Sequence, residues 1–180
     1  MTRTIFYTAT TLDGFLADEH DSLDWLFTQE QDKDGPLNYE EFIATIGAMA
    51  MGATTYQWIG EHLARTGEPW TYDVPCWVFT HREFEPLGDT VRFTSAPVPE
   101  VHAALVEAAG DRDIWMVGGG DLAAQFAEAG LLDELMLSIA PVTLGAGRPL
   151  FPRKFDLALT ELARNGAFLC ARYDVVGPRI

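Results

Sequence analysis

The chain is short of cysteine and of basic residues, and each shortage excludes a class of protein. Only two of its 180 residues are cysteine, Cys76 and Cys170, and neither lies at metal-ligand spacing from another cysteine or a histidine. A disulfide framework and a zinc site are therefore not expected, and no other metal is. Lys and Arg number 12 against 27 Asp and Glu, which gives a formal net charge of −15. Because nucleic acids and anionic lipids are bound by clustered Lys and Arg, neither is expected as a partner.

Long apolar runs are also missing. No stretch approaches the roughly 20 residues that a membrane-spanning helix needs. Residues 1–6 enter a strand pattern without the apolar region of a signal peptide. These absences predict a cytoplasmic protein. With 180 residues and 48% hydrophobic content, the chain is predicted to fold as a single domain, residues 1–180.

The most informative segment is residues 114–123, where an apolar strand pattern passes through three consecutive glycines into a helical pattern. Glycines at such a turn let the backbone approach a ligand without an intervening Cβ, and the free N–H groups of the first helical turn attract anions. We interpret the turn as a phosphate site, with Asp121 capping the helix and the amides around Gly119, Gly120 and Leu122 facing the phosphates. A glycine turn needed only for packing is the alternative.

Two further turns place polar groups after apolar strands. After Gly52, Thr54 or Thr55 is predicted to cap a second helix, whose N-terminus is a second anion site. Two helix N-termini suit a diphosphate. After the strand at 76–80, His81 and Arg82 are predicted to pair with a further phosphate, because Arg binds phosphate in a bidentate manner. A solvated polar turn is the alternative there.

Hydrophobic periodicity predicts strands alternating with helices, followed by a hairpin. Strands are expected at about 3–9, 48–52, 76–80, 91–94, 114–117 and 134–140, and helices at about 36–46, 54–63, 98–109 and 122–129. Alternating apolar residues at 155–160 and 169–175, on either side of a turn at 164–166, predict an antiparallel hairpin. The expected fold is a three-layer α/β domain with a mixed sheet of about eight strands and about four helices.

The glycine pattern Gly118-x-Gly120-x-x-Ala123 matches the dinucleotide fingerprint formally, but its context argues against a Rossmann domain. It lies two-thirds along the chain, and no acidic residue ends the next strand. Residues 10–35 show little periodicity and are predicted to form a long functional loop. The apolar residues around Trp25 favour a loop anchored by burial, and Asp13 is expected to shape its first turn.

Five segments carry a resemblance that runs from about residue 3 to residue 176. They are TLDGFLA at 11–17, MGATTY at 51–56, VGGG at 117–120, LLDEL at 131–135 and PVTLGAGRPLF at 141–151. In order and spacing they resemble the dihydrofolate reductase-like family. The match is closer to the branch related to the C-terminal reductase domain of the bifunctional riboflavin-biosynthesis protein.

The resemblance implies an NADPH-dependent reductase that transfers a hydride to a C=N or C=O group of a small substrate. That substrate would be heterocyclic or resemble a ribosyl-pyrimidine, as for a 5-amino-6-(5-phosphoribosylamino)uracil reductase. The nicotinamide would lie near Ala9 and Gly14, the 2′-phosphate near Arg82, and the diphosphate near Thr55 and Gly119. In full, the implied cofactor-binding residues are Ala9, Thr10, Gly14, Phe15, Gly52, Ala53, Thr54, Thr55, Thr80, His81, Arg82, Val117, Gly118, Gly119, Gly120, Asp121 and Leu122.

The sequence departs from the family pattern at Ala53, where a basic residue is usual, and this leaves Arg82 with more of the selectivity for NADPH. Classical dihydrofolate reductases carry an acidic residue on the first helix, where this chain offers Tyr39 among its candidates. The candidate catalytic residues are Asp13, Asp24 and Tyr39, and the candidate substrate-binding residues are Trp25 and Ser138.

Three other functions remain open at this point. They are a non-catalytic NADP(H)-binding protein of the same fold, dihydrofolate reductase activity proper, and a plain anion-binding domain. Relatives of this type are often dimers, so the resemblance implies a homodimer, with the C-terminal hairpin as its contact surface.

Overall fold

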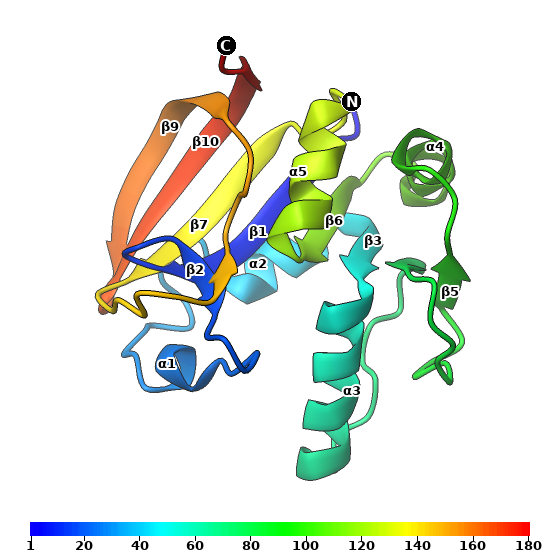
Figure 1. Ribbon diagram of the computed structural model, residues 1–180, viewed down its shortest axis with the longest axis horizontal. Helices are drawn as coiled ribbons and strands as arrows, with labels where there is room; N and C mark the ends of the chain where they lie inside the picture. Colours follow the sequence, from blue (N-terminus) through cyan, green and yellow to red (C-terminus); the bar gives the residue numbers. More distant parts are fainter.

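A computed structural model describes all residues, 1–180, and its centre is an eight-stranded sheet (Figure 1). The strand order is β5-β4-β3-β6-β1-β7-β10-β9. The first six strands in this order are parallel, and β10 and β9 form an antiparallel hairpin at one edge. The strands of the sheet are β1 (Thr4–Thr11), β3 (Ile46–Gly52), β4 (Cys76–Phe79), β5 (Val91–Thr94), β6 (Asp113–Gly118), β7 (Glu134–Ala140), β9 (Phe155–Asn165) and β10 (Phe168–Pro178). The mixed sheet with a terminal hairpin is confirmed.

Five helices accompany the sheet, one more than expected. They are α1 (Asp24–Phe27), α2 (Tyr39–Ala44), α3 (Ala53–Thr66), α4 (Val98–Ala109) and α5 (Gly120–Glu128). The additional helix is the single turn α1, which lies in the segment predicted to be a loop. The same segment contains β2 (Phe15–Ala17), which pairs with β8 (Arg148–Pro149) in a separate antiparallel ribbon. No helix combines the length and apolar character needed to cross a bilayer.

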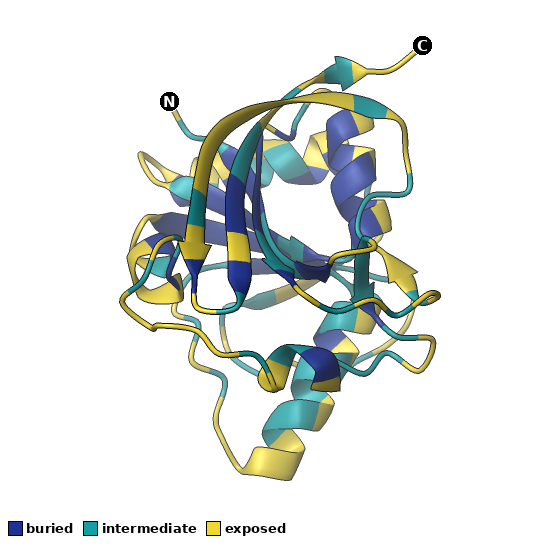
Figure 2. Cartoon of the chain, turned by 90° about the vertical axis from the view of Figure 1, so that its left-hand side faces the viewer, coloured by how far each residue is buried: buried dark blue, intermediate teal, exposed yellow.

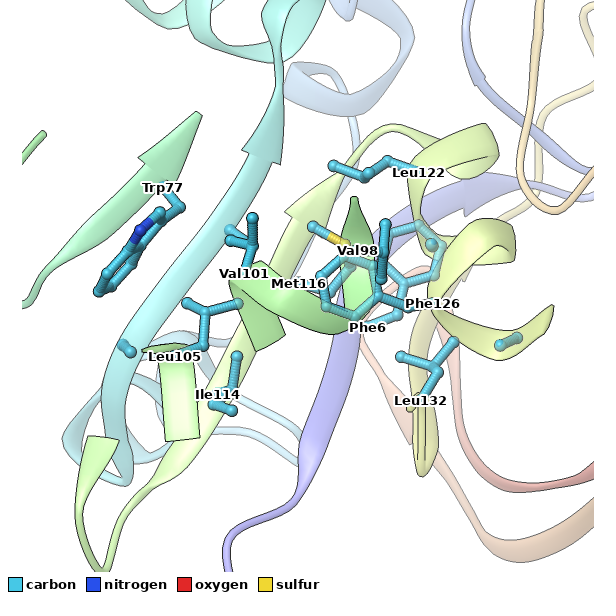
Figure 3. Close-up of a cluster of buried hydrophobic side chains, with 14 of the residues drawn as sticks. Phe6, Trp77, Val98, Val101, Leu105, Ile114, Met116, Leu122, Phe126 and Leu132 are labelled. Carbon is cyan, nitrogen blue, oxygen red and sulfur yellow. The ribbon is translucent and has the colours of Figure 1, made fainter. Parts of the chain in front are cut away.

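Alternate residues of the central strands enter two different cores, as the two-residue period of a strand requires. Phe6 and Met116 pack with α4 and α5 on one face, whereas Ile5 and Trp115 pack with α2 and α3 on the other. In the first core, Phe6, Met116, Leu122 and Phe126 converge beneath α5 (Figure 3). The result is the three-layer arrangement predicted from the sequence.

Three predicted helix starts are wrong. The first predicted helix begins not at Pro36 but at Tyr39, because Asn38 caps it by accepting a hydrogen bond from the Glu41 amide at 2.9 Å. The other two begin directly after glycines in extended conformation, Gly52 and Gly119, and neither has a side-chain cap. Thr54, Thr55 and Asp121 therefore lie inside the first turn of their helices and do not cap them.

The C-terminal hairpin is longer than predicted and turns at Gly166–Ala167, one residue later than the expected 164–166. Its outer strand, β9, is mostly exposed along its length (Figure 2). At the tip, the buried Asn165 side chain accepts a hydrogen bond from the Asp32 amide at 2.8 Å and donates to the Asp32 and Pro36 carbonyls at 3.0 and 3.2 Å. The hairpin thus holds the segment that follows α1.

His102 on α4 gives the fold a pH dependence whose direction can be predicted. Its Nε2 lies 2.9 Å from Thr4 Oγ1, and burial lowers the pKa of His102, against a smaller opposing effect of Asp133. The folded state therefore binds this proton less readily than the unfolded chain, whose histidine pKa is about 6.5. The stabilisation is complete above that pKa and is lost as the pH falls through the lower pKa of the folded state.

We expect His102→Gln, which can still bond Thr4, to lose less unfolding free energy than the parent between pH 7 and pH 5. Urea denaturation at a series of pH values measures this difference. Identical pH profiles for the two proteins would contradict the prediction.

Candidate active site

A cavity of about 790 Å³ lies at the carboxyl ends of the parallel strands, within the size range of small-molecule sites. In Figure 1 this is the lower side of the sheet, where β2, α1 and the start of α3 gather. Its lining includes residues of β1 (Thr8, Ala9), the α1 segment (Asp21, Leu23, Trp25, Leu26), the junction of β3 and α3 (Gly52, Ala53, Thr54, Thr55, Trp58), the turn after β4 (Thr80, His81), the junction of β6 and α5 (Val117, Gly118, Gly119, Gly120, Asp121, Leu122) and β8 (Arg148, Pro149).

Two helix N-termini meet in this cavity. Helices α3 and α5 begin after Gly52 and Gly119, and a Cβ built on Gly52 would lie 3.7 Å from the Gly119 nitrogen. The first N–H groups of a helix have no partner within the helix and carry its positive dipole end. The two adjacent starts therefore form a positively polarised patch that suits a diphosphate, in a chain whose net charge is −15.

The three glycines at the junction of β6 and α5 serve different purposes. A Cβ on Gly119 would meet nothing within 4 Å, so this position faces open space. A Cβ on Gly120 would lie 2.2 Å from the Pro149 carbonyl oxygen, so this glycine allows β8 to rest directly on the start of α5. Gly118 has a φ of +154°, which favours glycine, and a Cβ there would lie 3.2 Å from Thr55 Oγ1.

The turn after β4 brings basic groups to the rim of the cavity. Thr80 and His81 line it, whereas Arg82 lies just outside. The Arg82 guanidinium donates a 2.9 Å hydrogen bond to Gln57 on α3 and lies 4.9 Å from the Phe84 ring centroid. Gln57 is about one turn from the start of α3, so the Arg82 charge is held near that helix start by a neutral partner.

The other end of the cavity is apolar and aromatic. Leu23, Trp25 and Leu26 line it from the α1 segment, and Trp58 lines it from α3; we call these four residues the apolar wall. Trp25 is buried against Ala140, Phe168 and Cys170, which confirms that the segment is anchored by burial. The Trp25 Nε1–H is buried and has no hydrogen-bond partner in the protein.

The predicted residues around the first turn shape that turn and do not line the cavity, with the exception of Ala9. Thr10 Oγ1 donates to the Phe15 carbonyl at 3.2 Å, and Gly14 takes a φ of +83°. The Asp13 carboxylate accepts bonds from Thr11 Oγ1 at 2.6 Å and from the Gly145 amide at 2.8 Å. Hydrogen bonding, mainly from Thr11, lowers the pKa of Asp13. Asp13 therefore fastens the turn to the loop at 141–147.

The remaining predicted catalytic and substrate-binding residues, apart from Trp25, also lie outside the cavity lining. Asp24 is exposed at the start of α1. Tyr39 packs edge-on against Trp115 with ring centroids 5.9 Å apart, and burial, with a smaller effect of Tyr72, raises its pKa. Ser138 Oγ lies 3.9 Å from the Cys170 thiol across β7 and β10.

Sequence reasoning missed the ion pair between Asp21 and Arg148. The Arg148 Nε and Nη2 donate to the two Asp21 carboxylate oxygens at 2.6 and 3.0 Å, and both residues line the cavity. The pairing raises the pKa of Arg148. The two positions are 127 residues apart, so no local pattern signals the contact. The cavity wall at Pro97 and Val98 was also missed, although the sequence does show a strand followed by a helix there.

Comparison with known proteins identifies a family whose sequence model matches most of the chain. The sequence model of the RibD C-terminal domain matches residues 3–167. The uncharacterized protein YwjB of Bacillus subtilis (strain 168) is 33% identical over 150 residues, which are 83% of this chain and 82% of that protein. The uncharacterized protein YyaP of the same organism is 29% identical over 157 residues, 83% of this chain and 80% of that protein.

Solved structures show the same fold. A Shewanella sp. PV-4 protein named for riboflavin biosynthesis superimposes with a TM-score of 0.81 at 22% identity, covering 96% of this chain and 98% of that one. The Thermotoga maritima diaminohydroxyphosphoribosylaminopyrimidine deaminase/5-amino-6-(5-phosphoribosylamino)uracil reductase superimposes with a TM-score of 0.65 at 18% identity. That match covers 97% of this chain and 56% of the Thermotoga protein.

Proposed function

Since the chain belongs to the RibD C-terminal domain family, we propose that it is an oxidoreductase that uses NADPH to reduce a C=N or C=O group of a small heterocyclic molecule. The observation that carries the proposal is the meeting of two helix N-termini beside the open position at Gly119. A nicotinamide dinucleotide has a diphosphate at its centre and flat rings at its ends. The cavity is lined by the starts of two helices, whose free amides suit a diphosphate, and by the apolar residues Leu23, Leu26 and Trp58.

The diphosphate would be held by the amides at the starts of α3 and α5. The first-turn amides around Ala53 and Thr55 would bind one phosphate, and those around Gly120 and Leu122 the other. The Asp121 carboxylate lines the cavity, but Arg153 and Gln125 bond it at 3.0 and 2.8 Å, and the Arg153 charge offsets its repulsion of a phosphate.

Selectivity for NADPH over NADH would come from the turn after β4, at the rim of the cavity. His81 lines the cavity, and Arg82 is held near the start of α3 without a carboxylate partner, so its charge is available to a 2′-phosphate. The lack of a basic side chain at Ala53 leaves these two residues as the contacts for that phosphate.

A bound NADPH would supply the hydride for the carbon of the C=N or C=O group and become NADP⁺, and a water molecule would supply the proton that completes the amine or alcohol. The protein's part is to orient the cofactor and the substrate and to exclude bulk water. Trp25, Leu26 and Trp58 surround the reacting end with apolar surface. The Asp13 bonds to the loop at 141–147 hold the adjoining turn in place.

Titration with NADPH and NADH, followed by nicotinamide fluorescence, tests the cofactor assignment. We expect NADPH to bind in the micromolar range and more tightly than NADH. Failure of both to bind below millimolar concentration would overturn the proposal. NADPH binding without turnover of any carbonyl, imine or pterin substrate would instead identify a non-catalytic NADP(H)-binding protein. Equal affinity for NADPH and for inorganic phosphate would identify a plain anion-binding domain.

Arg82→Ala is expected to weaken NADPH binding by about 10- to 100-fold, the usual effect of one lost charge-assisted hydrogen bond. NADH, which has no 2′-phosphate, should bind the variant as it binds the parent. Parallel fluorescence titrations give both dissociation constants, with Arg92→Ala as control, because Arg92 lies over Trp77 and does not line the cavity. An equal loss for both nucleotides would remove Arg82 from the 2′-phosphate site.

We also infer that the protein is a homodimer that buries the C-terminal hairpin. Leu159 and Leu162 on β9 are 53% and 60% exposed, and Leu169 on β10 is 47% exposed. Exposed leucines on an unpaired edge strand are unusual for a monomer, because edge strands are normally protected against pairing.

A further inference from the structure

The Arg82 guanidinium at the rim of the cavity is held by neutral groups. Its Nη1 donates a 2.9 Å hydrogen bond to Gln57 Oε1 on α3, and its Cζ lies 4.9 Å from the centroid of the Phe84 ring. Arg148 and Arg153, in contrast, form ion pairs with carboxylates at 2.6 and 3.0 Å, respectively. Since Arg82 forms no ion pair, its positive charge is held in place without being neutralised.

The backbone that carries Arg82 is fixed by Thr80. The Arg82 amide donates to Thr80 Oγ1 at 2.8 Å, and the Thr80 hydroxyl donates to the Arg82 carbonyl at 3.2 Å. The long Arg82 side chain is exposed and is fixed only by its contacts with Gln57 and Phe84. A free arginine side chain samples many rotamers, so a contact that already fixes it reduces the entropy lost when it binds a phosphate.

The Gln57 amide can satisfy both of its neighbours in only one orientation. Its Nε2 donates at 2.8 Å to Glu61 Oε1, one helical turn further along α3, while its Oε1 accepts from Arg82. A carboxylate only accepts hydrogen bonds and a guanidinium only donates them, so an inverted amide would lose both bonds. Glu61 therefore turns the amide oxygen of Gln57 toward Arg82, although it forms no ion pair with Arg82 itself.

The position of Gln57 on α3 keeps the guanidinium beside the cavity. Thr54 lies three residues before Gln57 and lines the cavity. Residues three apart in a helix lie on the same face, one turn from each other. The bond to Gln57 thus keeps the Arg82 guanidinium close to the side of α3 that faces the cavity.

We propose that Gln57 is a positioning residue that sets the preference for NADPH over NADH. It holds the Arg82 guanidinium at the rim for the 2′-phosphate, and as a neutral partner it leaves the positive charge to that phosphate. Position 57 then has two separate requirements, a hydrogen-bond acceptor and the absence of negative charge. The inference rests on the reductase function proposed above and adds the residue that acts through Arg82 at that site.

Two substitutions separate these requirements. Gln57→Met keeps the length of the side chain and removes the acceptor, whereas Gln57→Glu keeps an acceptor and adds a charge that neutralises Arg82 and repels a phosphate. Both new residues are good helix formers, so α3 is expected to stay intact, which thermal denaturation checks. We expect NADPH affinity to fall about 3- to 10-fold in Gln57→Met and about 10- to 100-fold in Gln57→Glu, with NADH affinity within about 2-fold of the parent's.

Fluorescence titration with both nucleotides gives the ratio of NADPH to NADH affinity for each protein. Gln31→Glu is the matched control for the added charge, because Gln31 is exposed and lies outside the cavity lining, and its ratio should equal the parent's. A parent-like ratio in either Gln57 variant, or equal losses for the two nucleotides, overturns the inference. A smaller loss in Gln57→Glu than in Gln57→Met also overturns it.

Gln57→Met in an Arg82→Ala background shows whether Gln57 acts through Arg82. We expect no further change in NADPH affinity there, because the group that Gln57 positions is gone. A further loss in the double variant would mean that Gln57 contacts the cofactor directly, and the positioning role would be wrong.

The parent protein alone reports on the proposed function. If it binds NADPH no more tightly than NADH, the proposed cofactor selectivity fails and this inference fails with it. If the parent is selective and the Gln57 variants are equally selective, only this inference is overturned.

Discussion

Gly119→Ala is expected to abolish tight NADPH binding while leaving the protein as stable as before. The backbone at Gly119 is extended, with φ −88° and ψ −174°, a conformation open to any residue. An added Cβ would meet nothing within 4 Å, so no part of the protein has to move. The methyl group would instead occupy the space beside the first amides of α5, where the diphosphate has to approach.

The expected loss of NADPH affinity is about 100-fold, equivalent to about 2.7 kcal/mol, because displaced phosphate oxygens lose charge-assisted bonds to backbone amides. Fluorescence titration measures the affinity, and thermal denaturation confirms the fold. Gly60→Ala is the control, since a Cβ there would make only ordinary contacts with Leu87 at 3.5 Å, away from the cavity. Parent-like NADPH binding by Gly119→Ala would remove the glycine turn from the cofactor site.

Phe126→Ala is expected to cost about 3–5 kcal/mol of unfolding free energy. The ring is fully buried on the inner side of α5, where Figure 3 shows it among Phe6, Met116 and Leu132, and it packs edge-on against Phe79 at 5.9 Å. Its removal takes away apolar burial and leaves a cavity that close-packed neighbours fill only in part.

Because whole domains are stable by only about 5–15 kcal/mol, this loss is a large share of the total. For a chain of this size it corresponds to a fall in melting temperature of roughly 6–20 °C. Urea denaturation of the parent, Phe126→Ala and the milder Phe126→Leu measures the series. A loss below 1 kcal/mol for the alanine variant would show that the core beneath α5 is not closely packed.

The features that the sequence predicts well are local in the chain. The strand, glycine turn and helix at 114–123 follow from a periodicity change at three glycines, and the structure brings this turn together with Gly52, Thr55 and His81 in one cavity. Apolar and polar residues alternate within segments 155–160 and 169–175, and this predicts two strands of a hairpin because the face on which a residue lies depends only on its position along the strand.

The features that could not be predicted depend on contacts between distant segments. Helix α1 has only four residues, too few to show a helical period, and it is held by the burial of Trp25 against Ala140 and Phe168. The Asp21–Arg148 pair joins positions in different segments of irregular chain. Helix starts were misplaced because a good capping residue, such as Thr54 or Asp121, also occurs commonly inside a first turn.

The hydrogen bonds of Asn165, and the packing of Trp25 against Phe168, make the C-terminal hairpin a support for the cavity wall although the hairpin itself lies outside the lining. No residue after Pro149 lines the cavity, yet the hairpin tip holds Asp32 and Pro36, while Arg148 holds Asp21 on the other side of α1. The chain is thus held on both sides of α1, the short helix that carries Trp25: Arg148 bonds Asp21 before it, and the C-terminal hairpin bonds Asp32 after it. A variant truncated after Pro149 would keep every residue that lines the cavity. It would nevertheless lose the contacts of the hairpin that hold the chain after α1, and the cavity would lose its shape.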